Sequence, residues 1–291
     1  MTENQHKYLV YWYWASIFSQ HYAGSSNEVI IQDSIILSTI AKDQKITDRN
    51  YLYKLRLQIS SPEELHAYTK KGSAIYRGIL NFVNFAAGGL IDWNNTSRLS
   101  FNHSKLEDHH IFPKHYLLSK FSKNEEIIAL ADSVVNKTLI PKITNIKIGQ
   151  KPPHQYMNEL LQKNPNLRNS LQNHLITPDL LDGYYDDDYL IFVQERAKVI
   201  YQLLQYNISQ KSDEIRTQFY QESKVFVTTQ VVHHRNLPVM HQQHLNKICE
   251  NVDLSLASMN WIAYTMFHEE RDGYSRPGVK RRGCAPHPAI A

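Results

Sequence analysis

The chain has 291 residues, a length that suits one large domain or two modest ones. Its 42% hydrophobic and 11% aromatic content excludes a chain that is disordered throughout. The two cysteines, Cys249 and Cys284, lie far apart, which excludes a disulfide scaffold and a cysteine-rich zinc ribbon and fits a reducing cytoplasm. No signal peptide and no membrane span of roughly 20 apolar residues is found, so we expect a cytoplasmic protein without a membrane partner.

Four helical stretches are predicted in the first third of the chain. Residues 7–22 are apolar nearly all around and should be buried among other helices. A helix of this kind so near the first residue indicates either the C-terminal part of a longer protein or a surface that docks on a partner. An amphipathic pattern follows over 29–40. The Ser-Pro-Glu-Glu at 61–64 is typical of a capped helix start, and 73–87 form a helix that the glycines at 88–89 stop.

The pattern changes in the middle of the chain. Strands are predicted over 104–109 and 136–140, with a helical insert over about 116–134 between them. Pro141-Lys142 suits a turn. Pro152-Pro153 opens another helix, because proline is well placed in the first helical turn. A short antiparallel hairpin is therefore expected within a helical protein.

A long amphipathic helix is predicted over 186–210. The three aspartates at 186–188 are interpreted as a cap that favours the positive end of the helix dipole, with a metal site as the alternative. Beyond it we expect a strand over 224–232, a helix over 254–267 and a poorly ordered tail from residue 271. The expected fold class is α+β, mainly α.

The most specific stretch is Asp-His-His-Ile-Phe-Pro at 108–113, followed by Asn136 and Asn145. Hydrolysis of a phosphodiester needs a base near neutral pH, polarisation of the phosphate and charge stabilisation on the leaving oxygen. An imidazole can be the base because its pKa lies near 6.5, and one divalent ion can supply the other two. Adjacent residues of an extended chain can divide these tasks because their side chains point in different directions. The motif predicts a one-metal nuclease site.

The strand–turn–strand–helix order with two histidines at the first turn resembles the HNH, or ββα-metal, nuclease superfamily. The similarity is specific to the C-terminal HNH region of GmrSD-type restriction endonucleases, which are bacterial anti-phage enzymes directed at modified DNA. It is carried by residues 106–113, 136–140, 144–145, 147–149 and 152–153, with familiar flanking segments at 72–77 and 90–93. The resemblance implies a metal-dependent DNA endonuclease that acts in antiviral defence, built on a helical scaffold with an embedded ββα-metal motif.

The resemblance also implies residue roles. His110 matches the general base, and His109 and Asn145 match the protein ligands of one divalent ion. Asn136 matches the asparagine whose amide pins the loop that carries the base. Asp108 either orients His109 or binds the metal itself.

Nitrogen and oxygen ligands favour Mg²⁺ or Mn²⁺, and a histidine ligand keeps Zn²⁺ or Ni²⁺ open. Lys147 and Lys137 are the expected contacts to substrate phosphate. Between Arg98 and Arg168, eleven Lys and Arg stand against six Asp and Glu. This excess of five suits a polyanion near the motif, although an ordinary solvated surface explains it equally well.

The expected division is a helical region over 1–98, the HNH core over 99–165, a mainly helical region over 166–270 and the tail over 271–291. Double-stranded DNA, including modified DNA, is the expected partner. The sensing domain of GmrSD-type enzymes is missing from this sequence, which leaves nucleotide dependence and recognition of modified bases open for this chain; a separate subunit could supply them. A homodimer is a further expected partner, because a double-strand cut usually needs two such sites.

Other readings stay open. A non-catalytic module that binds DNA or docks on a partner could retain the ββα scaffold, and RNA could replace DNA as the substrate. A second histidine cluster, at 233–234, 241 and 244, is interpreted as chance. The basic run at 280–282 is interpreted as a solvated tail, with a DNA contact as the alternative.

Overall fold

A computed structural model describes residues 1–24, 26–42, 44, 52, 55–99, 106–218 and 221. The chain divides into two compact units, Met1–Lys224 and Val225–Ala291, and the described residues all belong to the first. The predictions for 224–232, for 254–267, for the second histidine cluster and for the basic tail lie outside the described residues. The expected boundaries at residues 98 and 165 fall inside the first unit, and the division into parts stays a prediction.

The described part of the chain is mainly helical and contains a two-stranded antiparallel sheet, which confirms the α+β, mainly α, fold class. Strand β1 (Leu106–His110) pairs with β2 (Lys137–Pro141) so that His110 lies opposite Lys137. Because a strand alternates its side chains between two faces, this register decides which residues of β1 share a face.

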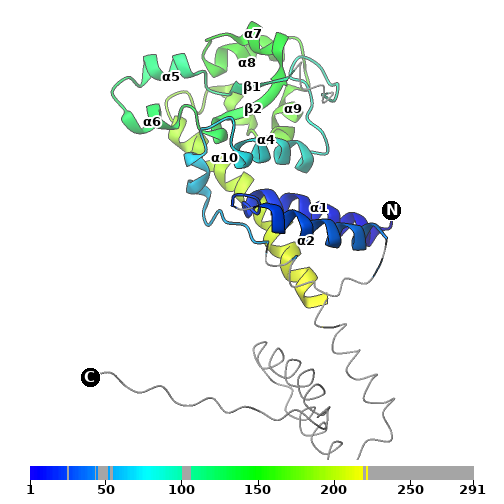
Figure 1. Ribbon diagram of the computed structural model, residues 1–291. Helices are drawn as coiled ribbons and strands as arrows, with labels where there is room; N and C mark the ends of the chain where they lie inside the picture. Colours follow the sequence, from blue (N-terminus) through cyan, green and yellow to red (C-terminus); the bar gives the residue numbers. More distant parts are fainter. Residues whose placement is uncertain are drawn as a thin grey trace, which may run out of the picture. The chain divides into compact units, whose positions relative to one another are not determined.

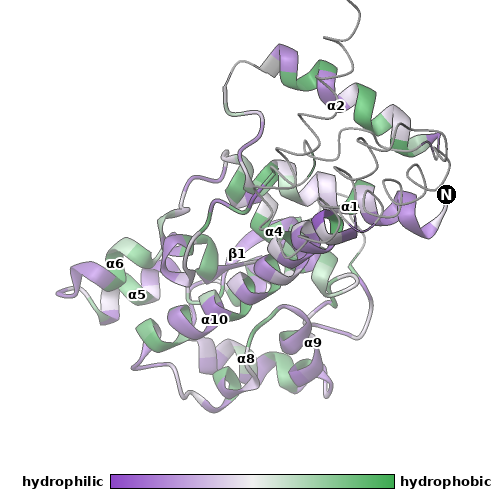
Figure 2. Ribbon diagram, turned by 90° about the horizontal axis from the view of Figure 1, so that it is seen from below, coloured by the Kyte–Doolittle hydropathy of each residue, from purple (hydrophilic) through white to green (hydrophobic). Residues whose placement is uncertain are grey.

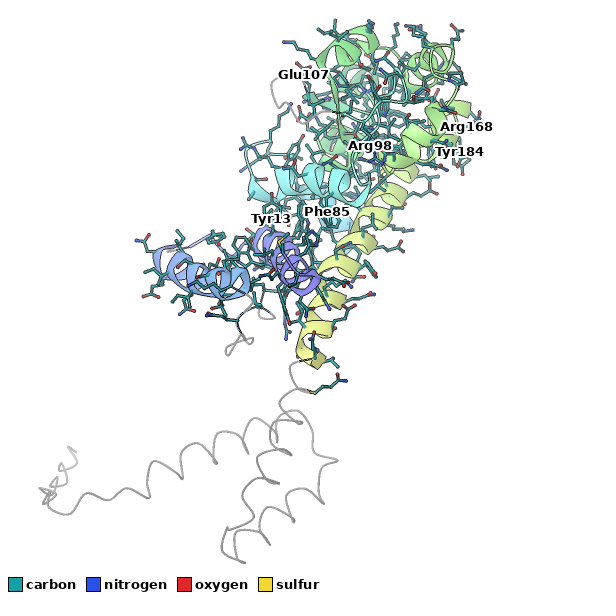
Figure 3. The ribbon with its side chains drawn as sticks, turned by 90° about the vertical axis from the view of Figure 1, so that its right-hand side faces the viewer. Tyr13, Phe85, Arg98, Glu107, Arg168 and Tyr184 are labelled. Carbon is teal, nitrogen blue, oxygen red and sulfur yellow. The ribbon has the colours of Figure 1, made fainter. Side chains whose placement is uncertain are left out.

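The first predicted helix is α1 (Glu3–Phe18), which begins and ends about one turn earlier than expected. Thr2 and Gln5 form a reciprocal capping box at its start. Its aromatic side chains pack on α4 (Ala74–Ala86), where the Trp14 ring meets Phe82 edge-on at 5.1 Å. Figure 3 shows Tyr13 of α1 and Phe85 of α4 at this junction.

Helix α2 (Ser26–Ala41) matches the amphipathic stretch expected over 29–40. Its inner side buries Ile36 and Ile40, whereas Ile30, Ile31 and Ile35 are exposed. Figure 2 shows this mixture of apolar and polar segments along α2.

Two turn predictions meet different outcomes. Ser73 caps α4 by accepting the Tyr76 N–H, and Gly88 and Gly89 end the helix with φ of 62° and 105°, as expected. The helix start at 61–64 is instead the short 3₁₀ helix η1 (Pro62–Ala67), and the Ser61 side chain makes no capping hydrogen bond. The predicted serine cap was therefore wrong there.

The helical insert between the strands consists of α5 (Lys114–Lys120), α6 (Glu125–Leu130) and the 3₁₀ turn η3 (Val134–Asn136). The turn expected at Pro141-Lys142 is the start of another helix, α7 (Lys142–Ile148), because Pro141 has φ of −60° and leads straight into helical backbone. Helix α8 (Pro153–Leu161) begins at the predicted proline pair. It is followed by α9 (Leu167–Asn173) and η4 (Pro178–Asp182).

The long C-terminal helix is α10 (Tyr189–Leu204), continued by the π-helical turn η5 (Gln205–Gln210). The predicted aspartate cap is confirmed at Asp188 alone. Asp188 is the N-cap residue but makes no side-chain capping bond, while Asp186 pairs with His154 and Asp187 with Lys120. These aspartates attach the start of α10 to α8 and α5.

Figure 1 shows the β1–β2 hairpin between α4 on one side and α7 and α8 on the other. Helix α10 runs from η3, beside the hairpin, to the end of α1. The buried core is continuous along this path and includes Phe18, Phe82, Phe112 and Phe192. Within the described ranges, every helix falls short of the combined length and hydropathy that crossing a membrane requires.

Candidate functional site

The two histidines of the motif contact different partners on opposite faces of β1. His109 contacts Asn145 of α7, whereas His110 contacts Asp132 and Lys137. The alternation of a strand explains the separation, since neighbouring side chains leave it in opposite directions. The hairpin therefore presents one face toward α7 and another toward α4 and the α6–η3 connection.

On the α7 face, His109 Nδ1 lies 2.7 Å from Asn145 Oδ1, and Asn145 Nδ2 lies 2.7 Å from Glu107 Oε2. An amide oxygen only accepts hydrogen bonds, so the proton of the His109 ring is on Nδ1 in this arrangement. The chain of bonds runs from strand to helix and back to the strand.

His109 is also a core residue, with 3% of its surface exposed. The rings of Trp93 and Tyr156 meet it edge-on at 5.6 and 5.9 Å. Burial lowers the pKa of His109 to about 4, so its imidazole is neutral at physiological pH. Its Nε2 is buried with no hydrogen-bond partner among the described residues.

On the other face, His110 Nε2 lies 2.8 Å from Asp132 Oδ1 and 2.7 Å from Lys137 Nζ. One ring nitrogen holds either a proton or a lone pair, so these two partners compete for it. Burial and then the charge of Lys137 lower the pKa of His110, while Asp132 opposes them. His110 is therefore a neutral imidazole at pH 7, with 25% of its side chain exposed.

The two groups that flank His110 are themselves perturbed. Burial lowers the pKa of Lys137 to about 8, and the side chain is 1% exposed. Burial acts to raise the pKa of Asp132, but hydrogen bonds from Lys114 and His110 outweigh it and lower that pKa to about 2. Asp132 is thus a carboxylate and Lys137 mainly an ammonium at neutral pH.

Asp108 shares this face with His110. Its carboxylate accepts hydrogen bonds from Lys71 Nζ at 2.7 Å and from the Tyr76 hydroxyl at 2.8 Å. These partners hold Asp108 on the side of β1 away from His109. The two expected roles of Asp108 were to orient His109 or to bind a metal ion together with it. Asp108 instead contacts Lys71 and Tyr76.

Asn136 is fully buried and braces the turn that follows β1. Its side-chain oxygen accepts the Phe112 N–H at 2.9 Å, and its amide donates to Phe112 O at 3.0 Å and Ala131 O at 2.9 Å. Its backbone oxygen accepts the Ile111 N–H. This is the geometry of an asparagine that pins the loop after the histidine pair.

A buried layer behind β2 supports the brace. The Arg196 guanidinium of α10 donates to the carbonyls of Val135, Lys137, His174 and Leu175. It thereby holds the backbone on both sides of Asn136. No local sequence signal marks Arg196, because its position in an amphipathic helix does not distinguish a buried arginine from an exposed one.

The two predicted phosphate contacts differ in exposure. Lys147 is exposed in the last turn of α7, two residues after Asn145, whereas Lys137 is buried beside His110. His115, which follows the motif, is exposed on α5. In the ranges that the structure describes, no group of three or more His, Cys, Asp or Glu side chains is arranged to hold a metal ion.

The sequence matches no family model, and no solved structure matches it. It is similar to the uncharacterized protein MJ0686 of Methanocaldococcus jannaschii, with 33% identity over 183 residues. The match covers 59% of this chain and 30% of that protein, so the chain spans less than a third of its relative's length. The relative is itself uncharacterized, and its name indicates no activity.

Several residues of the site are visible only in the structure. Glu107 joins the His109 face, and Asp132, Lys114 and Lys71 join the His110 face. The alternation of side chains along a strand could have predicted that Glu107 shares a face with His109, since it lies two residues earlier. The positions of Asp132, Lys114 and Lys71 could not be predicted, because no sequence pattern in their segments indicates packing against β1.

Proposed function

We propose that the chain is a metal-dependent endonuclease of the HNH type that hydrolyses phosphodiester bonds in DNA. The observation that supports it most is the 2.7 Å contact of His109 Nδ1 in β1 with Asn145 Oδ1 in α7, adjacent to His110. This contact joins a residue of β1 to a residue of α7, the helix that follows β2, and the neutral imidazole of His110 is the next residue of the strand. A role in bacterial defence and modified DNA as substrate are proposed from the resemblance to GmrSD-type enzymes, and a cytoplasmic location from the cysteine content of the sequence.

His110 is the proposed general base. In the reactive arrangement its Nε2–H donates to Asp132, which leaves the lone pair of Nδ1 available to accept a proton from water. Asp132 and the Asn136 brace hold the ring and the turn that follows it, so little motion is needed at the moment of reaction.

The donor atoms on the α7 face fit a divalent ion. His109 Nδ1 and Asn145 Oδ1, which lie 2.7 Å apart, are the protein atoms that would hold such an ion. Binding there requires the His109 proton to move from Nδ1 to Nε2. The Glu107 carboxylate accepts a hydrogen bond from Asn145 Nδ2 and so holds that amide with its oxygen toward His109. When bound there, a divalent ion would supply polarisation of the phosphate and charge stabilisation on the leaving oxygen.

The substrate would lie across the end of β1. Adjacent Cα atoms are about 3.8 Å apart, so a phosphate over the strand end can reach side chains that leave both faces. Asn145 and His110 are both partly exposed there, whereas Lys147, two residues after Asn145, leaves a different side of α7. His110 and Asn145 would supply a base and an ion ligand for one phosphodiester.

Plasmid nicking in Mg²⁺ or Mn²⁺ tests this function by comparing the wild type with His110→Ala. Removal of a general base should lower the rate by roughly 10²–10⁴-fold. The exposed His115→Ala is the matched control and should cleave at the wild-type rate. Equal cleavage by wild type and His110→Ala would exclude the mechanism.

One observation favours a second function, a nucleic-acid-binding module without catalysis. His109 and Asn145 already satisfy each other by a hydrogen bond in a buried setting, which an ion would have to open. Metal-independent gel shifts with no nicking in any divalent ion would support this rival. The same panel with RNA, and with modified and unmodified DNA, identifies the substrate class.

A further inference from the structure

Lysines from three separate parts of the chain converge on the face of β1 that carries His110. Lys71 precedes α4 and reaches a carboxylate of β1. Lys114 is the first residue of α5 and pairs with Asp132. Lys137 begins β2 and lies against His110 itself. Tertiary packing, rather than sequence proximity, places these amines around the imidazole.

The three amines differ in how freely they can change partner. The side chains of Lys71 and Lys114 are 63% and 47% exposed, whereas that of Lys137 is 1% exposed. Exposed ion pairs contribute little to stability, so another anion can replace the carboxylate oxygens at Lys71 and Lys114. Lys137 stays in place as a buried positive charge.

These amines outnumber the carboxylates that face them. Asp108 and Asp132 are the two acids of the set, which leaves one excess positive charge when His110 is neutral. Burial lowers the pKa of Lys137 most; Asp108 and Asp132 act to raise that pKa, and the charges of Lys71 and Lys114 act to lower it. Like charges this close favour the arrival of an anion.

The position of the set indicates which anion it would hold. One carboxylate, that of Asp132, touches both Lys114 and His110, so a group that replaces it at Lys114 lies beside the proposed base. A phosphate has the charge and the acceptor oxygens to replace a carboxylate between two lysines.

We propose that Lys71 and Lys114 form a phosphate clamp, in which oxygens of a nucleic-acid backbone replace Asp108 Oδ1 at Lys71 and Asp132 Oδ2 at Lys114, while Asp132 Oδ1 keeps its contact with His110 Nε2. The clamp rests on the proposed function, because it names the residues that hold the substrate strand at that site. It assigns to Lys71 and Lys114 the backbone contacts that the sequence had indicated for Lys147 and Lys137.

The test is the salt dependence of binding to a short fluorescein-labelled DNA duplex, followed by fluorescence anisotropy in EDTA so that cleavage does not interfere. The variants are Lys71→Gln, Lys114→Gln and the double variant, with Lys198→Gln, an exposed lysine of α10, as the matched control. Each phosphate-binding lysine should contribute about 0.9 to the slope of log affinity against log salt. Between about 50 and about 200 mM KCl, the factor by which affinity falls should therefore be roughly 3.5-fold smaller for each clamp variant than for the wild type.

Lys71→Arg and Lys114→Arg should retain wild-type binding, because they keep the charge. Wild-type affinity and slope in the Gln variants would overturn the clamp, as would equal losses in the Gln and Arg variants or the absence of salt-dependent binding by the wild type. The nicking assay separates the clamp from the function beneath it. If His110→Ala cleaves like the wild type while the clamp variants lose binding, the nuclease proposal fails and the clamp stands.

Discussion

His110 Nε2 lies 2.8 Å from a carboxylate oxygen of Asp132, a residue 22 positions further along the chain. The contact joins the end of β1 to the connection between α6 and η3. A carboxylate that accepts an imidazole N–H selects the tautomer and fixes the ring plane. Asp132 is therefore a positioning residue for the proposed base.

Asp132→Asn tests that role. The amide keeps the shape but removes the charge, so the Nε2–H tautomer of His110 loses its preference and the nicking rate should fall roughly 10–100-fold. Imidazole ¹⁵N chemical shifts should change from the Nε2–H tautomer toward a mixture. Asp182→Asn, in an exposed ion pair with Arg168, is the control and should change neither readout. An unchanged tautomer with a lower rate would contradict the positioning role.

The lowered pKa of Lys137 predicts that the free energy of unfolding depends on pH. Its pKa is about 8 in the folded protein and about 10.4 in an unfolded chain, so between these values the unfolded state binds more protons. The free energy of unfolding should therefore gain a contribution that rises with pH over this window. Thermal unfolding should show the rise in the wild type and lose it in Lys137→Met. Lys147→Met, at an exposed lysine, should keep the wild-type profile.

Asn136→Asp should destabilise the fold. The carboxylate of the variant still accepts the Phe112 N–H. In the wild type, however, the Asn136 amide donates to the carbonyl oxygens of Phe112 and Ala131, and the variant places a carboxylate oxygen beside those oxygens instead. The expected loss is about 2–5 kcal/mol by chemical denaturation. Asn124→Asp is the matched control, because Asn124 is an exposed N-cap of α6 where aspartate caps equally well. Similar stability of the two variants would contradict the brace.

Arg196→Met removes a buried guanidinium that donates to four carbonyls. Those acceptors would be left without donors in the core, so we expect a loss of about 3–5 kcal/mol in the free energy of unfolding. Arg168→Met, at a half-exposed arginine, should change it by less than about 0.5 kcal/mol. A small effect at Arg196 would mean that water satisfies these carbonyls.

Gly78→Ala tests the packing of α1 on α4. A Cβ at this position would lie 2.6 Å from Ile17 Cγ2, a branched side chain between the helices. Alanine gains about 1 kcal/mol of helix propensity, but overpacking costs about 1–3 kcal/mol, so a net destabilisation is expected in thermal unfolding. Gly72→Ala has open space at its Cβ and should be neutral or stabilising. A more stable Gly78→Ala would show that α1 and α4 separate easily.

Local patterns determined much of this protein. The apolar periodicity of α1 and α4, the glycines after Ala86 and the proline pair before α8 are all set by backbone preferences that act within one or two turns. The alternation of a strand likewise implied that His109 and His110 would leave β1 in opposite directions. Such preferences also misplaced the 3₁₀ turn at η1 and two of the aspartates before α10, where contacts to distant residues outweigh them.

The sequence by itself thus determined the mainly helical class, the hairpin and the identity of the candidate residues His109, His110, Asn136 and Asn145. Only the tertiary structure decided their partners. These partners are Asp132 beside His110, Glu107 on Asn145, Lys71 on Asp108, and Arg196 behind the Asn136 turn, and each pair joins residues 22 to 61 positions apart. These contacts depend on how whole helices pack over β1 and β2, and on the burial that shifts each pKa, which no short stretch of sequence encodes.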